Sequence, residues 1–177
     1  GHLEIEGWDC IELADSYGTP LFVISESMIR LNYKRFNGAF SSRYPKVMTC
    51  YSTKANWGLA FQKVLASEGA GAEVWGPHEL YIALLVGYDP KKIVFNSNNK
   101  SREDLKSALK AGVSIHADNP EELDMLDSLG AELDETVGVC IRLTPDLSQL
   151  DDVYMTDYRY VPPKLSLGKW LRDKQFG

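Results

Sequence analysis

The sequence predicts an α/β chain built from parallel βαβ units. Two observations support this class. Short, apolar, β-rich runs alternate with helical patterns from residue 47 to residue 143, and the alternation repeats at intervals of roughly 25 residues. Strands that alternate with helices pair in parallel through right-handed crossovers. We count five such strands, and each element follows in chain order below.

The chain opens with an N-terminal segment and strand, residues 1–24. Residues 3–18 contain a short amphipathic helix pattern, and a turn follows at Tyr17–Pro20. Leu21–Ile24 is short, apolar and β-rich, which predicts a buried strand. Helical spacing then predicts a helix of about four turns, marked by Ile29, Tyr33, Phe36 and Phe40.

The regular alternation begins with a predicted strand at Val47–Thr53, followed by a helix with an apolar stripe over residues 61–65. A short strand is expected at Ala72–Trp75. The next run, Pro77–Val86, is a strongly apolar helix that Gly87 stops.

The later units carry clear helix start and stop residues. Ser101 is a predicted N-cap and Gly112 closes its helix, while Asn119 caps a helix with proline in its first turn and Glu122 at N3. The remaining strands are expected at Ile93–Phe95, Val113–Ala117 and Val137–Leu143.

Residues 144–177 break this rhythm and are rich in Asp, Tyr and Pro. A closed eight-stranded barrel typically needs about 250 residues. The length of this chain therefore indicates either part of a barrel or a smaller open sheet. The segment with Tyr154, Tyr158, Tyr160 and Pro162-Pro163 is either a loop or a remodelled substrate mouth.

Composition narrows the class of partner. The 177 residues hold 19 basic and 25 acidic side chains, a formal charge of −6 without long single-sign runs. This balance disfavours nucleic acid, and no apolar run approaches the roughly 20 residues that cross a bilayer. The three cysteines are far apart, without metal-ligand spacing, and indicate reduced thiols in the cytoplasm. We expect a cytoplasmic protein that acts on small molecules and binds no metal.

Lys54 is the main candidate for chemistry. It closes the predicted strand Val47–Thr53, and strand alternation would place it on one face with Met48, Cys50 and Ser52. In a barrel this position is the upper rim, where barrel enzymes carry catalytic groups. A lysine with a buried stem and a lowered pKa is a good amine nucleophile. The alternative is a solvated lysine at the end of a strand.

The six residues Tyr51–Asn56 resemble the lysine motif of the pyridoxal-phosphate (PLP) decarboxylases with an alanine-racemase-type barrel, the diaminopimelate and ornithine decarboxylase group. Further blocks match in the same order: Tyr17–Leu21, Gly69–Val74 with Glu79-Leu80, Ile93–Phe95 with Asn98–Ser101, Asp118 with Glu121–Leu123, Arg142–Pro145, and Lys174–Gly177. The resemblance implies the first part of a TIM (β/α)8 barrel of PLP fold-type III, with about five βα units in residues 25–177.

The resemblance also implies roles for particular residues. Lys54 would bind the aldehyde of pyridoxal 5'-phosphate. Glu73 stands where the family usually has aspartate and would lie near that lysine, Arg142 would face the cofactor ring hydroxyl or a substrate acid, and Glu79 would lie near the cofactor. Gly76-Pro77-His78 replaces the usual Ser-Gly-Gly, which leaves the backbone contacts there open.

The implied activity is decarboxylation of an amino acid, with meso-diaminopimelate, which yields L-lysine and carbon dioxide, as the first choice. Ornithine, arginine and carboxynorspermidine remain alternatives, and so does a non-catalytic homologue that binds a partner. The family's phosphate loop and second, β-rich domain have no matching motif in these residues. We therefore expect this chain to be inactive alone. The resemblance also implies that the full-length protein is a homodimer.

Overall fold

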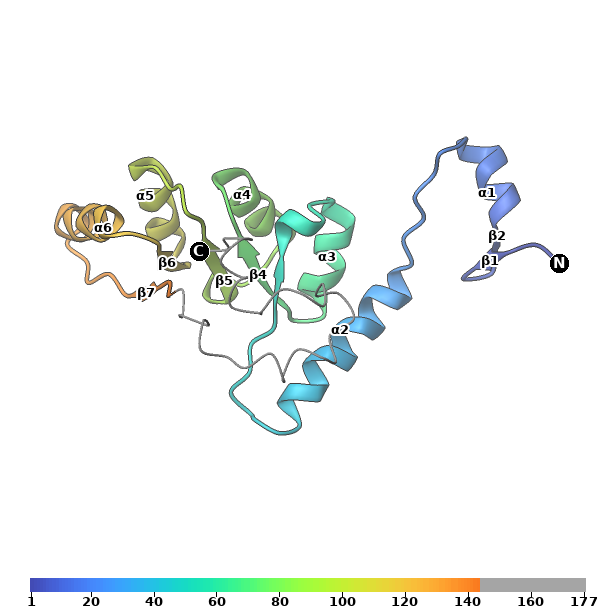
Figure 1. Cartoon of the computed structure of the whole chain (residues 1–177), viewed down its shortest axis with the longest axis horizontal. Helices are drawn as coiled ribbons and strands as arrows, with labels where there is room; N and C mark the ends of the chain where they lie inside the picture. The colour runs from blue at the N-terminus through green and yellow to red at the C-terminus, as the bar shows by residue number, and fades with distance from the viewer. Residues whose placement is uncertain (144–177) are drawn as a thin grey trace, which may run out of the picture.

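The centre of the fold is a five-stranded parallel sheet. The computed structural model describes residues 1–143 and orders the strands β3-β4-β5-β6-β7, so neighbours in sequence are neighbours in the sheet (Figure 1). The strands are β3 (Cys50–Ser52), β4 (Gly71–Val74), β5 (Ile93–Asn96), β6 (Ser114–Ala117) and β7 (Val139–Ile141). The predicted class and the predicted number of parallel strands are confirmed.

Helices connect successive strands and cover one face of this sheet (Figure 1). Side chains on that face are fully or almost fully buried, because they pack between strands and helices; they include Val74, Ile93, Phe95 and Ile115. The helical connections are α3 (Leu59–Ser67), α4 (Pro77–Val86), η2 (Pro90–Lys92), α5 (Arg102–Ala111) and α6 (Pro120–Leu133).

The predicted helix ends agree with the structure because they depend on local chemistry. The Ser101 and Asp104 side chains form a reciprocal capping box at the start of α5. The Asn119 side chain accepts a hydrogen bond from the Glu122 backbone at the start of α6. Gly87 and Gly112 end their helices with φ of 91° and 72°, a region that favours glycine.

The strand predicted at Val47–Thr53 is shorter than expected. Only Cys50–Ser52 pair with the neighbouring strand, and Thr53–Ala55 form the 3-10 turn η1. The two-residue alternation therefore stops before Lys54, and the expectation that Lys54 continues the strand face of Cys50 and Ser52 is wrong. Side chains alternate only while the backbone stays extended.

The strand predicted at Leu21–Ile24 is also wrong. These residues pair with no described strand, and Phe22 is 94% exposed. They link a small N-terminal unit to the long helix α2 (Glu26–Ser41). Apolar, β-rich composition makes a strand only where another strand offers hydrogen bonds.

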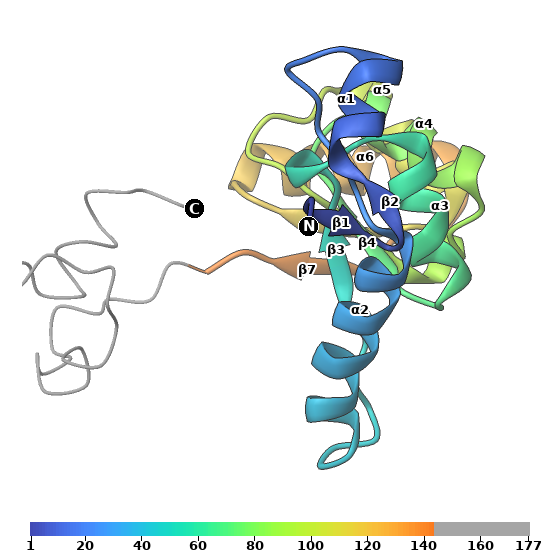
Figure 2. The same cartoon turned by 90° about the vertical axis from the view of Figure 1, so that its right-hand side faces the viewer.

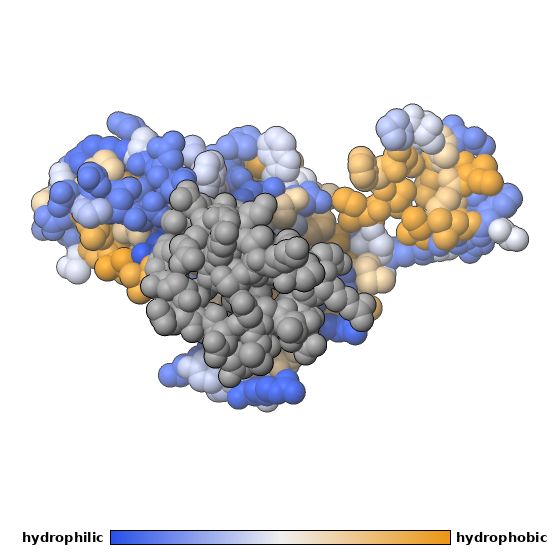
Figure 3. All heavy atoms as spheres, in the orientation of Figure 1, coloured by the Kyte–Doolittle hydropathy of each residue, from blue (hydrophilic) through white to orange (hydrophobic). Residues whose placement is uncertain are grey.

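The N-terminal unit consists of the antiparallel pair β1 (Glu4–Ile5) and β2 (Trp8–Asp9), followed by α1 (Cys10–Tyr17). It stands apart from the sheet in Figure 1, and Figure 2 shows α2 reaching beyond the β3 edge. Apolar residues gather on this unit in Figure 3, consistent with the exposure of Leu3, Trp8 and Ile11. No helix within residues 1–143 is long and apolar enough to cross a membrane.

Candidate active site

The sheet face opposite the helices carries a row of polar side chains. Ser52 pairs in register with Glu73, and Asn96 pairs with His116, so these residues point to the same face of four consecutive strands. All four are half-buried, whereas their strand neighbours on the helix face are buried. The alternation of core and polar residues in β5 and β6 is a sequence signal that would have singled out Asn96 and His116.

Glu73 is fixed from both neighbouring strands. The Ser52 hydroxyl donates to Oε2 of Glu73, and Nδ2 of Asn96 donates to Oε1 over 3.2 Å. A carboxylate bound on both oxygens keeps one orientation across the sheet. This gives the predicted site residue Glu73 a defined direction on the polar face.

The polar row also contains an acceptor without a partner. Oδ1 of Asn96 is the one buried side-chain oxygen or nitrogen in residues 1–143 that makes no hydrogen bond. His116 is the register partner of Asn96 in the neighbouring strand. Burial lowers the pKa of His116; Glu73 raises it, and Arg142 and Lys100 lower it further. The ring is therefore neutral near pH 7 and able to donate one hydrogen bond and accept another.

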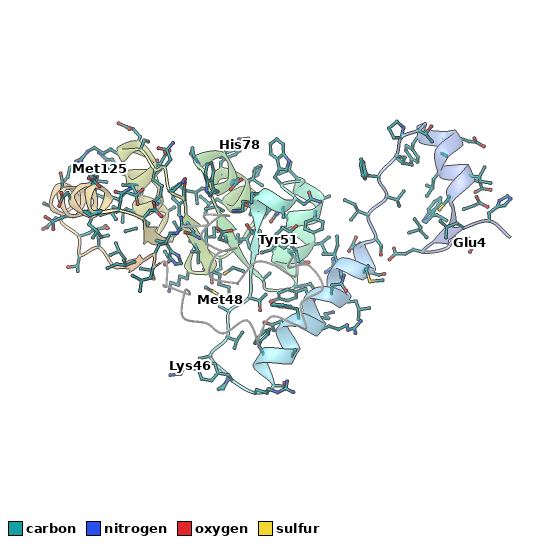
Figure 4. All side chains as sticks on the ribbon, viewed as in Figure 1. Glu4, Lys46, Met48, Tyr51, His78 and Met125 are labelled. Carbon is teal, nitrogen blue, oxygen red and sulfur yellow. The ribbon has the colours of Figure 1, made fainter. Side chains whose placement is uncertain are left out.

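Lys54 lies in η1, directly after the carboxyl end of β3. The residue is exposed, and its ammonium group pairs with no carboxylate in the part of the chain that the structure describes. Figure 4 shows Lys46 at the opposite end of the segment that carries β3, and His78 at the edge of the sheet where β3 ends. The amine of Lys54 is thus presented at the edge where all five strands end.

The turn that carries Lys54 is anchored by its neighbour Thr53. The Thr53 side chain is fully buried, and its hydroxyl lies 3.0 Å from the carbonyl oxygen of Glu73 and 3.1 Å from Oε2 of Glu79. The same Glu79 oxygen accepts a hydrogen bond from the Trp75 backbone at 2.5 Å. Glu79 therefore ties the end of β3 to the start of α4.

Arg142 follows the last residue of β7 and lies at the same edge. Its backbone donates to the carbonyl of Ala117 over 2.9 Å, and its Nη1 lies 3.0 Å from Oδ1 of Asp118. Both side chains are largely buried. The structure thus brings Arg142 to the carboxyl ends of the strands, and adds Asp118, whose pairing the sequence did not reveal.

His78 stands further out at this edge. Its ring meets the Trp57 ring in an edge-on arrangement with centroids 5.8 Å apart, and both residues are exposed. Among residues 1–143, no group of three or more histidine, cysteine or acidic side chains is arranged to hold a metal ion.

These features define a class of protein: a β/α-barrel-type parallel sheet with an amine, carboxylates and an arginine at the carboxyl ends of its strands. An exposed primary amine suits condensation with an aldehyde, and Oδ1 of Asn96 is a buried acceptor without a partner beside the polar face. The residues present therefore fit the aldehyde and ring of pyridoxal phosphate.

The comparison with known families is consistent with this class. Residues 27–158 match the family described as pyridoxal-dependent decarboxylase, pyridoxal binding domain. The chain belongs to this family, whose cofactor is pyridoxal 5'-phosphate.

Similar proteins with curated descriptions are diaminopimelate decarboxylases. The protein from Methanothermobacter thermautotrophicus is 44% identical over 132 residues, which are 75% of this chain and 31% of the relative. The Bacillus subtilis protein is 38% identical over 157 residues, 88% of this chain and 36% of the relative. The solved diaminopimelate decarboxylase of M. jannaschii in complex with L-lysine is 39% identical, with a TM-score of 0.77, over 80% of this chain and 34% of that one.

The chain spans about a third of the length of the curated relatives that it matches. Residues 144–177, with the tyrosine-rich segment and the Lys174–Gly177 block, lie outside the described residues.

Proposed function

We propose that this chain is the N-terminal part of a pyridoxal-phosphate-dependent diaminopimelate decarboxylase, which converts meso-diaminopimelate to L-lysine and carbon dioxide. The observation that carries the proposal is the exposed amine of Lys54, anchored through Thr53 at the carboxyl ends of parallel strands. The relatives named diaminopimelate decarboxylase support the reaction, and a neighbour crystallised with L-lysine supports the product.

Each residue of this edge has a part in the proposed reaction. Lys54 Nζ is the amine that would hold the aldehyde of the cofactor, and it would carry a proton whenever it is free. The Glu73 carboxylate, held by Ser52 and Asn96, stabilises that positive charge. Bound pyridoxal phosphate supplies the electron sink for the electron pair left when carbon dioxide departs.

Arg142 and Glu79 have different parts. The Arg142 guanidinium, whose direction Asp118 fixes, would bind an anionic oxygen of the cofactor or substrate. Glu79 keeps the Lys54 turn in place through Thr53 and Trp75, and would be one of the groups beside the bound cofactor.

The complete protein, on this proposal, is a cytoplasmic homodimer that acts on a small amino acid. Its acidic balance of charges disfavours nucleic acid as a partner. Sedimentation of the complete gene product tests the dimer.

The role of Lys54 is tested by trapping the cofactor. The complete gene product is incubated with pyridoxal phosphate, reduced with borohydride and digested, and the modified peptide is identified by mass spectrometry. We expect the label on the peptide with Lys54, and we expect Lys54→Ala to lose both the label and the visible absorbance of the bound cofactor. Lys46→Ala, which changes an exposed lysine at the far end of the same segment, is the matched control.

Label on another lysine in the wild-type protein would refute the proposal for Lys54. The substrate is tested separately with a panel of amino acids under saturating cofactor. Release of carbon dioxide from meso-diaminopimelate is expected at the highest kcat/KM. Preference for ornithine or arginine would change the substrate but not the site, whereas turnover of none would favour a non-catalytic homologue.

A further inference from the structure

A buried ion pair lies beneath the carboxyl edge of the sheet. Nζ of Lys100, in the loop after β5, lies 2.9 Å from Oε2 of Glu122 in the first turn of α6. The two side chains are 0% and 3% exposed, so water reaches neither charge. Nζ of Lys100 also donates to the carbonyl of Ser97 and lies 5.9 Å from the centre of the Phe95 ring.

Stability alone does not explain this pair. The loss of hydration on burial offsets most of the attraction between two buried charges, and packed hydrophobic residues of similar volume often stabilise a fold equally well. Removal of one partner, by contrast, leaves an unpaired buried charge and is strongly destabilising. What the pair adds is a fixed orientation of the two side chains, because each buried charge requires its partner at one position.

The Glu122 carboxylate connects the ion pair to Asp118, next to the proposed site. Its Oε2 accepts a hydrogen bond from the Asp118 backbone over 2.9 Å, while the Asn119 side chain accepts one from the Glu122 backbone over 2.9 Å. These reciprocal bonds fix the turn between β6 and α6. Asp118, at the start of this turn, holds Arg142 through its carboxylate.

We propose that Lys100 and Glu122 are positioning residues, which set the direction of Arg142 through the backbone and carboxylate of Asp118. The chain of contacts runs from Ser97 through Lys100 and Glu122 to Asp118 and then Arg142. It connects the loops after β5 and β6 with the end of β7. This inference rests on the proposed function, in which Arg142 faces an anionic group of the cofactor or substrate.

The test separates stability from positioning in the complete gene product. The double variant Lys100→Met/Glu122→Leu replaces the pair with apolar side chains of similar size. Its melting temperature is expected to stay within about 5 °C of wild type. Backbone amides of residues 97–101 and 118–119 are expected to exchange with solvent faster, and the Kd for pyridoxal phosphate or the KM for substrate to rise by about tenfold.

A second variant covers the case in which the double variant does not fold. Asp118→Asn weakens the link to Arg142 without touching the buried pair, and it is expected to raise the same Kd or KM with little change in melting temperature. Glu132→Gln is the matched control. It removes exposed ion pairs between α5 and α6, with Arg102 and Lys106, and is expected to leave the exchange rates, Kd and KM unchanged.

The outcomes distinguish the two proposals. Suppose that the cofactor binds through Lys54 as proposed. If the double variant and Asp118→Asn then both keep the Kd and KM of the wild-type protein, the positioning role is overturned. An additional rise in Kd or KM when the double variant is combined with Arg142→Ala would also overturn it, because the pair would then act by another route. If the wild-type protein fails to bind the cofactor through Lys54, the proposed function fails and the positioning role fails with it.

Discussion

At the scale of single residues, the site depends on which groups are fixed and which are free. Thr53 is fully buried and hydrogen-bonded to Glu73 in β4 and to Glu79 in α4, while Lys54 beside it is exposed. Glu73 is held on both oxygens. The site thus combines a carboxylate of fixed orientation with an exposed lysine on an anchored turn.

The first prediction concerns the charge on Glu73. Glu73→Gln keeps the length of the side chain and one acceptor oxygen but removes its negative charge. We expect kcat of the complete gene product to fall by about 100-fold, because the variant lacks the charge that we propose to stabilise a protonated Lys54. Steady-state kinetics and thermal melting check this together. A lower melting temperature with unchanged kcat would mean that Glu73 is only structural.

The second prediction concerns the pH dependence of stability through His116. Its pKa in the folded chain lies below its ordinary value of 6.5, chiefly because burial opposes the charged ring; Glu73 raises this pKa, and Arg142 and Lys100 lower it. As the pH falls below about 6.5, the unfolded chain takes up the proton first, so the stability of the fold decreases. Above that pH the ring is neutral in both states and contributes no dependence.

His116→Gln keeps an uncharged hydrogen-bonding side chain at this position. We expect the variant to lose less stability than the wild type when the pH is lowered from about 7.5 to about 5.5. Urea unfolding at the two pH values measures the difference. Equal losses in both proteins would show that His116 does not titrate in this way.

At the scale of elements, local chemistry was predicted well and pairing less well. The caps Ser101 and Asn119 and the stop at Gly112 were readable because the bonds involve neighbouring residues. The strand expected at Leu21–Ile24 was wrong and β3 was shorter than expected, because strand formation depends on residues distant in sequence. Asn96 and His116 were missed although the alternation was visible.

The third prediction compares two helix glycines. Gly38 in α2 has nothing within 4 Å of an added Cβ, so Gly38→Ala should stabilise the fold by up to about 1 kcal/mol. Gly130 in α6 would place its Cβ 2.9 Å from the backbone oxygen of Glu135 and 3.1 Å from Val137. A backbone oxygen cannot move aside as a flexible side chain can.

We therefore expect Gly130→Ala to destabilise the fold by about 1–3 kcal/mol, since overpacking outweighs the gain in helix propensity. Chemical denaturation of the two variants measures the change in the free energy of unfolding, which is expected to have opposite signs. Stabilisation by Gly130→Ala would contradict the close approach of residues 135–137 to α6.

At the scale of the whole molecule, β3 and β7 are the two edge strands of the described sheet. The sheet face opposite the helices carries the half-buried polar row. The amine, the carboxylates and the arginine lie on this chain, whose matched residues cover 31% and 36% of the length of two curated relatives. Lys54, Glu73 and Arg142 were identified from motif resemblance. Their contacts with Ser52, Asn96 and Asp118 required the fold, because β-sheet neighbours come from separate parts of the sequence.

The fourth prediction concerns the isolated chain of 177 residues. We expect it to bind pyridoxal phosphate at least about tenfold more weakly than the complete gene product, because none of its motifs offers a glycine-rich loop for the phosphate. Equilibrium titration of both proteins, followed by cofactor absorbance, makes the comparison. Equal, stoichiometric binding would show that the phosphate site lies within these residues.

The two faces of the sheet have a consequence for divergence within the family. Exchange of Glu73, Asn96 or His116 changes the polar face of the sheet and leaves the hydrophobic packing beneath the helices in place. Exchange of Val74, Phe95 or Ile115, each adjacent in sequence to one of those three, disrupts that packing. New substrate preferences can therefore evolve by substitutions at every second position of these strands, with little loss of folding.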